Sequence, residues 1–316
     1  MVIVANLMVS NDYPHHEGGW PPSAESIERQ LGYVAETSRA KLLSLNIAAR
    51  VFKLKVPANN RAKKKEEFTM RPQAVQSDMT TYPGQNGKAI NAYLSHPVTP
   101  GRYPGVIVIM EAFGLNDHIK DVARRFATEG YVALAPDMYT REGSPDPSNI
   151  NDVIKVMFSV PDSQAMADLD GGAVFLKGRP DSNGKVGAIG FCSGGRYTLM
   201  FGCTSKNLNA AVDSAGGFII QDEHTPQRPV SPIDMVKDLS CPLLGLFGEE
   251  DPNPSPAHAE RLEAELKKHG KTYEFRMYPN AGHAFFADYR PSYRPVAAQD
   301  MWHRVLQFYG KYLKGA

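Results

Sequence analysis

The chain reads Val186-Gly187-Ala188-Ile189-Gly190-Phe191-Cys192-Ser193-Gly194-Gly195 near its centre. An apolar run that enters a glycine-bracketed turn is typical of a nucleophile elbow, in which a strand turns sharply into a helix and presents one reactive side chain. The glycines are required because the turn is strained and neighbouring backbones pass close to it. The bracket places Cys192, not Ser193, at the apex. Because a thiol needs only a modestly lowered pKa to become nucleophilic, the stretch predicts a cysteine-nucleophile hydrolase rather than an inert core cysteine.

The composition indicates a soluble globular protein. With 316 residues, 42% apolar and 22% charged, the chain can bury one large core or two small ones. A formal net charge of +1 argues against nucleic acid or an acidic membrane surface as a partner. The three cysteines form no short pairing, which favours free thiols in a reducing compartment. We therefore expect a cytoplasmic protein without a membrane span, and without a metal or cofactor, since no C-x-x-C or H-E-x-x-H pattern occurs.

Residues 1–72 differ from the rest and are interpreted as a partly helical N-terminal extension. Ser23 is a candidate N-cap for a first helix, and a second apolar stretch covers residues 42–56. Residues 57–72 form the expected linker, whose charge run at 61–67 we interpret as solvated rather than as a basic docking patch, because glutamates offset part of its charge. The extension could pack on the main domain, join a second subunit in a homo-oligomer or cover the active site.

Residues 73–316 alternate strand and helix patterns and are interpreted as one domain. A hairpin is expected around Gly84-Gln85-Asn86-Gly87, whose residue types favour turns. Strands are expected at 78–82, 89–95, 105–110, 132–135, 185–189, 210–213, 242–247 and 272–278, and helices at 117–129, 162–177, 194–201, 256–269 and 299–313. Such alternation predicts a mostly parallel central sheet with helices on both faces.

An acid and a histidine follow the elbow in the chain order that this kind of fold requires. Asp251 comes after the strand at 242–247, and His283 comes after the strand at 272–278. Catalytic groups collect at the carboxyl ends of parallel strands, so we expect both side chains near Cys192. His283 would accept the thiol proton or stabilise the thiolate, and Asp251 would orient the imidazole. Glu249 or Glu250 could serve as the acid instead, and Asp251 could merely cap the turn.

The turn after the strand at 105–110 supplies the remaining expected site residues. An oxyanion hole needs two backbone N–H donors, which we assign to Ser193 and Ala112. Glu111 stands out because a carboxylate at the end of a buried strand has a desolvation cost. It either contacts Cys192 as a proton acceptor or gate, or caps the helix that follows.

Four separated motifs together resemble the dienelactone hydrolase (carboxymethylenebutenolidase) family of the α/β-hydrolase superfamily. They are Val108-Ile109-Met110-Glu111-Ala112-Phe113-Gly114-Leu115-Asn116, Pro136-Asp137-Met138-Tyr139-Thr140-Arg141, the elbow, and Gly282-His283-Ala284-Phe285. The resemblance covers residues 75–313 and implies an α/β-hydrolase fold. It also implies a triad of Cys192, Asp251 and His283, oxyanion donors at Ala112 and Ser193, and a resting thiol turned toward Glu111.

The resemblance also bears on the substrate. Members that cleave dienelactone hold its carboxylate with arginines, but one of those positions is Ala287 here and the segment 142–169 contains no arginine. Arg290 and Arg294 could reach the pocket instead. We therefore expect a neutral ester or lactone, cleaved through a thioester acyl-enzyme. Phe113, Tyr139 and Phe285 are expected to line the pocket, although aromatic residues beside strand ends are as often part of the core.

Two other functions fit the same elbow. Cys192 could act as a redox- or ligand-sensing thiol in a protein of this fold that turns over no ester. An acyl or group transferase is a third hypothesis, for which the sequence offers no acceptor-site motif.

Overall fold

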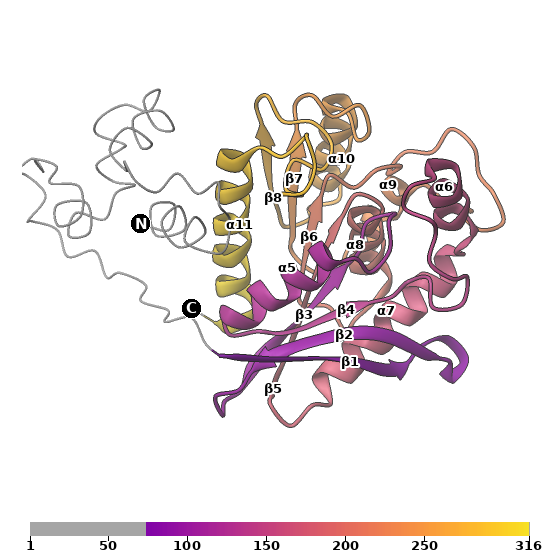
Figure 1. Ribbon diagram of the computed structural model, residues 1–316. Coiled ribbons are helices and arrows are strands. Elements are labelled where there is room, and N and C mark those ends of the chain that lie inside the picture. The colour runs from indigo at the N-terminus through magenta and orange to yellow at the C-terminus, as the bar shows by residue number, and fades with distance from the viewer. Residues whose placement is uncertain (1–73, 316) are drawn as a thin grey trace, which may run out of the picture. The chain divides into compact units, whose positions relative to one another are not determined.

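The computed structural model describes residues 74–315, which form an eight-stranded sheet flanked by helices (Figure 1). The predicted extension at residues 1–72 lies outside the described residues, so its helices, its linker and its role in a homo-oligomer stay predictions. The strand order is β1-β2-β4-β3-β5-β6-β7-β8. The strands are β1 (Val75–Pro83), β2 (Ala89–Pro97), β3 (Tyr103–Ile109), β4 (Val132–Pro136), β5 (Ser182–Phe191), β6 (Ala210–Ser214), β7 (Leu243–Gly248) and β8 (Tyr273–Tyr278).

The sheet is mostly parallel, as predicted. β1 and β2 form the expected antiparallel hairpin, and β2 pairs antiparallel with β4. All pairings among β3 to β8 are parallel. Because β3, β5, β6, β7 and β8 run in one direction, their carboxyl ends lie along the same edge of the sheet.

Helices cover both faces of the sheet. They are α5 (Asp117–Thr128), α6 (Ile150–Ser159), α7 (Asp162–Lys177), α8 (Ser193–Thr204), α9 (Pro232–Met235), α10 (Pro256–Lys268) and α11 (Pro295–Tyr309). The rings of Phe126 in α5 and Trp302 in α11 have centroids 4.7 Å apart, so these two helices pack together on one face. α7 and α8 pack together against the opposite face (Figure 1).

Two helices differ from the sequence prediction. α6 and α9 were not predicted, because both lie in long connections that are rich in proline and polar residues. α6 nevertheless has a defined start, since the Asn149 side chain accepts hydrogen bonds from the backbone N–H groups of Asn151 and Asp152. It also places Val153 and Met157 four residues apart on one buried face.

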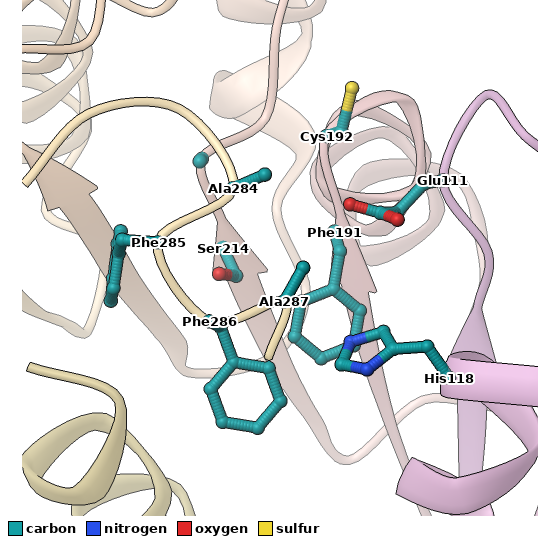
Figure 2. A pocket seen from close by; sticks show the side chains of 10 residues that line it. Glu111, His118, Phe191, Cys192, Ser214, Ala284, Phe285, Phe286 and Ala287 are labelled. Atoms are coloured by element: carbon teal, nitrogen blue, oxygen red, sulfur yellow. The ribbon is translucent and has the colours of Figure 1, made fainter. Parts of the chain in front are cut away.

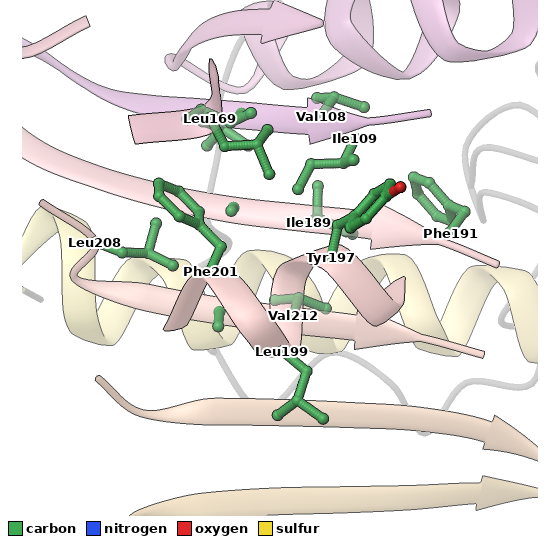
Figure 3. Packing of buried hydrophobic residues seen from close by; sticks show 14 of the residues in the cluster. Val108, Ile109, Leu169, Ile189, Phe191, Tyr197, Leu199, Phe201, Leu208 and Val212 are labelled. Atoms are coloured by element: carbon green, nitrogen blue, oxygen red, sulfur yellow. The ribbon is translucent and has the colours of Figure 1, made fainter. Parts of the chain in front are cut away.

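The core lies on both faces of the central strands. β3, β5 and β6 contribute the apolar runs 106–109, 186–191 and 210–212, which are buried because these strands are covered on both sides. Figure 3 shows side chains of α8 packed over these strands, with Tyr197, Leu199 and Phe201 extending from the helix. This packing fixes the direction in which β5 enters the elbow.

Candidate active site

The elbow holds Cys192 between the end of β5 and the start of α8. Cys192 has φ 57° and ψ −118°, a left-handed backbone conformation that is strained for any residue other than glycine. Its N–H donates to the Ser214 carbonyl at 3.1 Å, which ties the elbow to β6. A Cβ on Gly190 would lie 2.0 Å from the Gly194 carbonyl oxygen, so glycine is required there. The elbow thus presents a partly exposed thiol at a helix N-terminus, a position that favours negative charge.

The other two cysteines lie in a different environment. Cys203 and Cys241 are buried, and burial raises the pKa of each thiol to about 12. Neither is a candidate nucleophile, because a thiol that stays protonated at neutral pH is unreactive.

Asp251 and His283 come together from the loops that follow β7 and β8. His283 Nδ1 lies 2.9 Å from Asp251 Oδ2, and the other Asp251 oxygen accepts the Asn253 N–H at 2.8 Å. The Asp251 side chain is fully buried. By contrast, Glu249 and Glu250 are exposed. Of the three carboxylates left open by the sequence, Asp251 is therefore the one that contacts the imidazole.

Neighbouring side chains favour the protonated, positively charged form of His283. Burial alone lowers the pKa of this imidazole, but hydrogen bonds to the Asp251 and Cys192 side chains outweigh that effect and raise the pKa to about 10. The imidazolium form of His283 is therefore favoured near neutral pH, and its ring is paired with the Cys192 side chain. Such a pair provides a nucleophile and a proton donor in one arrangement.

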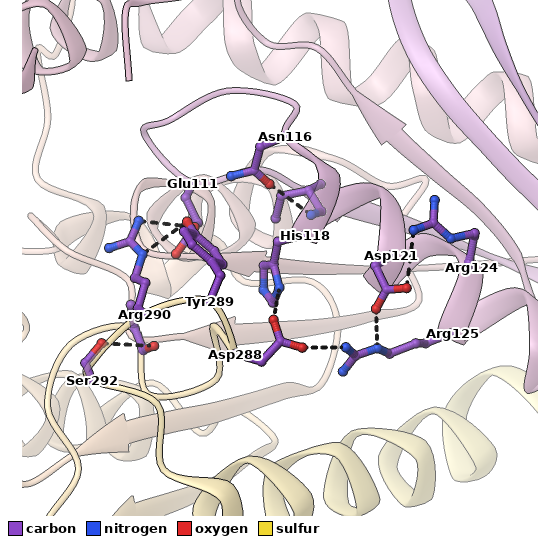
Figure 4. A network of polar contacts seen from close by, with 12 residues as sticks. Glu111, Asn116, His118, Asp121, Arg124, Arg125, Asp288, Tyr289, Arg290 and Ser292 are labelled. Atoms are coloured by element: carbon purple, nitrogen blue, oxygen red, sulfur yellow. Dashed lines mark hydrogen bonds and ion pairs between the residues drawn. The ribbon is translucent and has the colours of Figure 1, made fainter. Parts of the chain in front are cut away.

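Glu111 is buried at the end of β3 and is bound by the segment that follows His283. Its Oε2 accepts a hydrogen bond from the Tyr289 hydroxyl at 3.0 Å and lies 3.4 Å from Arg290 Nη2 (Figure 4). It does not cap the helix that follows, because the N-cap of α5 is Asn116, whose side chain accepts from the Ile119 N–H at 3.0 Å. Arg290, left open by the sequence, therefore reaches Glu111, whereas Tyr289 was not anticipated.

Glu111 and Cys192 border the same small cavity, which extends toward Phe191 and the loop after His283 (Figure 2). The cavity has a volume of about 10 Å³, about the size of one water molecule. A substrate therefore cannot lie in this cavity and must approach the thiol from its exposed side.

Ala112 and Ser193, the two predicted oxyanion donors, lie in segments that pass close to each other. Ser193 begins α8, and Ala112 follows Glu111 at the carboxyl end of β3. A Cβ on Gly194 would lie 2.5 Å from the Ile109 carbonyl oxygen, so the end of β3 passes directly against the first turn of α8. This close approach brings the two predicted oxyanion donors to the same edge of the sheet as Cys192.

The three predicted pocket aromatics lie in different surroundings. Phe113 is partly buried beside Ala112. Tyr139 is buried, and its hydroxyl donates to the Ala112 carbonyl at 3.0 Å, so it supports the turn that carries the proposed oxyanion donor. The Phe285 ring is 1% exposed, with its centroid 5.0 Å from that of Tyr278, although the residue borders the small cavity. Of the three, only Phe113 is partly exposed, and the role of all three in a substrate pocket stays a prediction.

A buried carboxyl below the elbow was not anticipated. Asp213 in β6 is fully buried, its Oδ1 accepts the Gly216 N–H at 2.8 Å, and its Oδ2 has no hydrogen-bond partner within the described part of the chain. Burial raises its pKa to about 7, with a smaller contribution from Asp251 and an opposing one from the Gly216 N–H. An aspartate within the apolar run Ala210-Ala211-Val212-Asp213 was the signal in the sequence that could have indicated it.

Residues 74–315 contain no group of three or more histidine, cysteine or acidic side chains arranged to hold a metal ion. None of the helices in this part of the chain has the length and apolar character that crossing a membrane requires.

Comparisons with known proteins agree on one family. A model of the dienelactone hydrolase family matches residues 90–313. A protein of Methylorubrum extorquens named "Putative carboxymethylenebutenolidase" is 40% identical over 233 residues, which cover 73% of this chain and 79% of that protein. A Bradyrhizobium protein named "Probable 2-oxo-3-(5-oxofuran-2-ylidene)propanoate lactonase" is 35% identical over 73% of this chain and 93% of its own length. The crystal structure of a "Putative Dienelactone Hydrolase" from Klebsiella pneumoniae has a TM-score of 0.71 and 37% identity, and the match covers 76% of this chain and 100% of that one.

Proposed function

The chain belongs to the dienelactone hydrolase family and has the α/β-hydrolase fold, and we propose that it hydrolyses a carboxylic ester or lactone through a thioester at Cys192. The observation that carries the proposal is the 2.9 Å contact between His283 and Asp251, beside a thiol held at the N-terminus of α8. The names of the relatives, a carboxymethylenebutenolidase and a lactonase, support this class of substrate.

The proposed reaction has two halves. The Cys192 thiolate attacks the carbonyl carbon, and the N–H groups of Ala112 and Ser193 bind the oxyanion. As the carbon–oxygen bond breaks, the His283 imidazolium gives its proton to the leaving alkoxide, and a thioester remains. His283, now neutral, takes a proton from water, whose oxygen attacks the thioester. The carboxylic acid leaves, and the thiolate and imidazolium are restored.

Glu111 is proposed to act on the resting thiol. It borders the same cavity as Cys192 and is held there by Tyr289 and Arg290. In this role the Glu111 carboxylate accepts a hydrogen bond from the Cys192 thiol in the absence of substrate and keeps that thiol protonated, which limits unwanted oxidation, because the thiolate is the form that oxidises.

The surroundings of the arginines support a neutral substrate. Arg290 is paired with Glu111, and its guanidinium lies 4.6 Å from the centroid of the Phe113 ring. Arg294 donates hydrogen bonds to backbone carbonyls, including that of Asn280 at 2.9 Å. Both cations already have partners within the protein, so a substrate carboxylate would have to displace them.

Turnover of p-nitrophenyl acetate by Cys192→Ala tests the proposal. We expect this variant to lose Cys192-dependent turnover, whereas Cys203→Ala, which removes a buried thiol outside the site, should retain it. Mass spectrometry of the wild type during turnover should detect an acyl group on Cys192. Full activity in Cys192→Ala would contradict the proposal. Oxidation of Cys192 by mild peroxide without any ester turnover would favour the redox-sensing alternative instead.

A further inference from the structure

A separate apolar cluster lies beside the proposed oxyanion site. It consists of Ala112, Val153 and Met157, with the partly buried rings of Phe113 and Phe218 packed against it. Val153 and Met157 come from α6 and are 1% and 5% exposed. The cluster is distinct from the main core, so Val153 and Met157 cover the turn that carries Ala112, whereas Val156 on the same helix packs against the main core.

α6 is held firmly in this position. At its C-terminal end, buried Arg228 donates a hydrogen bond from Nη2 to the Met157 carbonyl at 3.0 Å. The same guanidinium lies 3.9 Å from the centroid of the Phe158 ring. At its N-terminal end Asn149 supplies the cap. A helix fixed at both ends can keep its inward side chains at a constant distance from Ala112.

The two faces of α6 are both apolar but differ in exposure. Ile150, Ile154 and Phe158 are spaced four residues apart and are 56%, 45% and 38% exposed. Val153 and Met157 alternate with them on the covered face. Ile154 on the exposed face therefore offers a matched control on the same helix, whereas Phe158 does not, because its ring centroid lies 5.4 Å from that of Phe218.

We propose that Val153 and Met157 limit the size of the substrate group beside the oxyanion site, so that the enzyme prefers esters or lactones with short apolar groups. The inference rests on the proposed function, in which the Ala112 N–H binds the carbonyl oxygen. A donor of this kind lies about 3 Å from that oxygen, so groups on the carbonyl carbon lie close to whatever packs on Ala112. Those neighbours are apolar side chains, with Phe113 and Phe218 partly open to solvent.

The two side chains should contribute differently. Val153 is branched at Cβ and stiff, whereas Met157 is unbranched and adapts its shape. A methylene that fits or fails to fit an apolar pocket changes kcat/KM by about 10-fold or more. Met157→Ala is therefore expected to admit groups that the native pocket rejects.

The experiment compares kcat/KM across two substrate series. One series varies the acyl chain of p-nitrophenyl esters from acetate to octanoate, and the other varies the alcohol of acetate esters from ethyl to hexyl. We expect wild-type activity to fall with length in at least one series. In that series Met157→Ala should raise the ratio of long-chain to short-chain kcat/KM by about 10-fold. Ile154→Ala, on the exposed face of the same helix, should leave the ratio unchanged.

The outcomes separate the inference from the proposed function. Retained acetate turnover with an unchanged length ratio in Met157→Ala would overturn the role of α6 while leaving the hydrolase intact. If the wild type showed no Cys192-dependent turnover, both the proposed function and the inference about α6 would be contradicted. Met157→Val provides a milder change if the alanine variant folds poorly. We expect it to raise the ratio of long-chain to short-chain kcat/KM in the same direction, but by less. Thermal unfolding of each variant verifies that the compared proteins are folded.

Discussion

Asp213 offers a sharp test of the electrostatics beneath the elbow. Its carboxyl is fully buried, one oxygen has no partner among the described residues, and burial raises its pKa from 3.8 to about 7. Replacing it by asparagine keeps the shape of the side chain and removes the ionisation. The variant Asp213→Asn should therefore change how the free energy of unfolding depends on pH.

The sign and size of the effect follow from the two pKa values. Below pH 3.8 the carboxyl is protonated in both the folded and the unfolded chain. As the pH rises toward about 7, the unfolded chain loses the proton while the folded protein keeps it, so unfolding becomes more favourable. The cost is about 1.4 kcal/mol per pH unit well below pH 7 and becomes smaller as the folded-state carboxyl ionises, which gives about 2 kcal/mol between pH 5 and pH 7. Above pH 7 the effect levels off, because the carboxyl is ionised in both states.

The assay is urea denaturation of the wild type and Asp213→Asn at several pH values between 5 and 8. The new amide N–H group has no acceptor, which destabilises the variant by about 1–3 kcal/mol at every pH. The quantity to measure is therefore how the difference in unfolding free energy between variant and wild type changes with pH. We expect the variant to gain about 2 kcal/mol relative to the wild type from pH 5 to pH 7. Asp238→Asn changes an exposed carboxylate, and its unfolding free energy should depend on pH in the same way as that of the wild type. If the unfolding free energies of Asp213→Asn and the wild type depended on pH in the same way, the raised pKa of Asp213 would be refuted.

Two further predictions concern the groups around the thiol. Asp251→Asn should lower kcat/KM by about two to four orders of magnitude, because the imidazole loses the carboxylate that orients it. The high-pH limit of the kcat/KM profile should move to lower pH in this variant, since Asp251 contributes to the raised pKa of His283; an unshifted limit would contradict this role. Tyr289→Phe removes a hydrogen bond to Glu111 worth about 0.5–1.5 kcal/mol and should lower kcat/KM by about 2- to 10-fold. The exposed position of Tyr289 predicts an almost unchanged unfolding midpoint, and a large fall in that midpoint would point to a structural role instead.

The order and type of most elements could be predicted from the sequence, because local patterns determine them. The second half of the strand that enters Gly190-Phe191-Cys192-Ser193-Gly194, residues 186–191, is apolar because it is covered on both faces, and the turn needs glycines wherever backbones nearly touch. The chain order of Cys192, Asp251 and His283 follows from the same local reading, as each follows a recognisable strand. The family was therefore evident from the residues before any contact was known.

The tertiary structure decided which side chains from distant segments contact one another, because no local sequence pattern contains that information. Three carboxylates follow β7, and only the path of the loop buries Asp251 against His283 and turns Glu249 and Glu250 to solvent. Glu111 meets Tyr289, a residue 178 positions away in the chain, because β3 ends beside the loop that follows β8.

α6 is an element that the sequence did not predict and that tertiary contacts stabilise. Its sequence is short and lies between proline-rich turns, so its propensity to form a helix is weak on its own. The helix is stabilised instead by packing of Val153 and Met157 on the turn at Ala112 and by the bond from Arg228. The sequence alone thus determined the class of chemistry, through one strained turn and the order of three residues. The contacts that place Asp251 against His283, hold Glu111 and pack α6 on Ala112 join segments distant in the chain, and only folding brings those segments together.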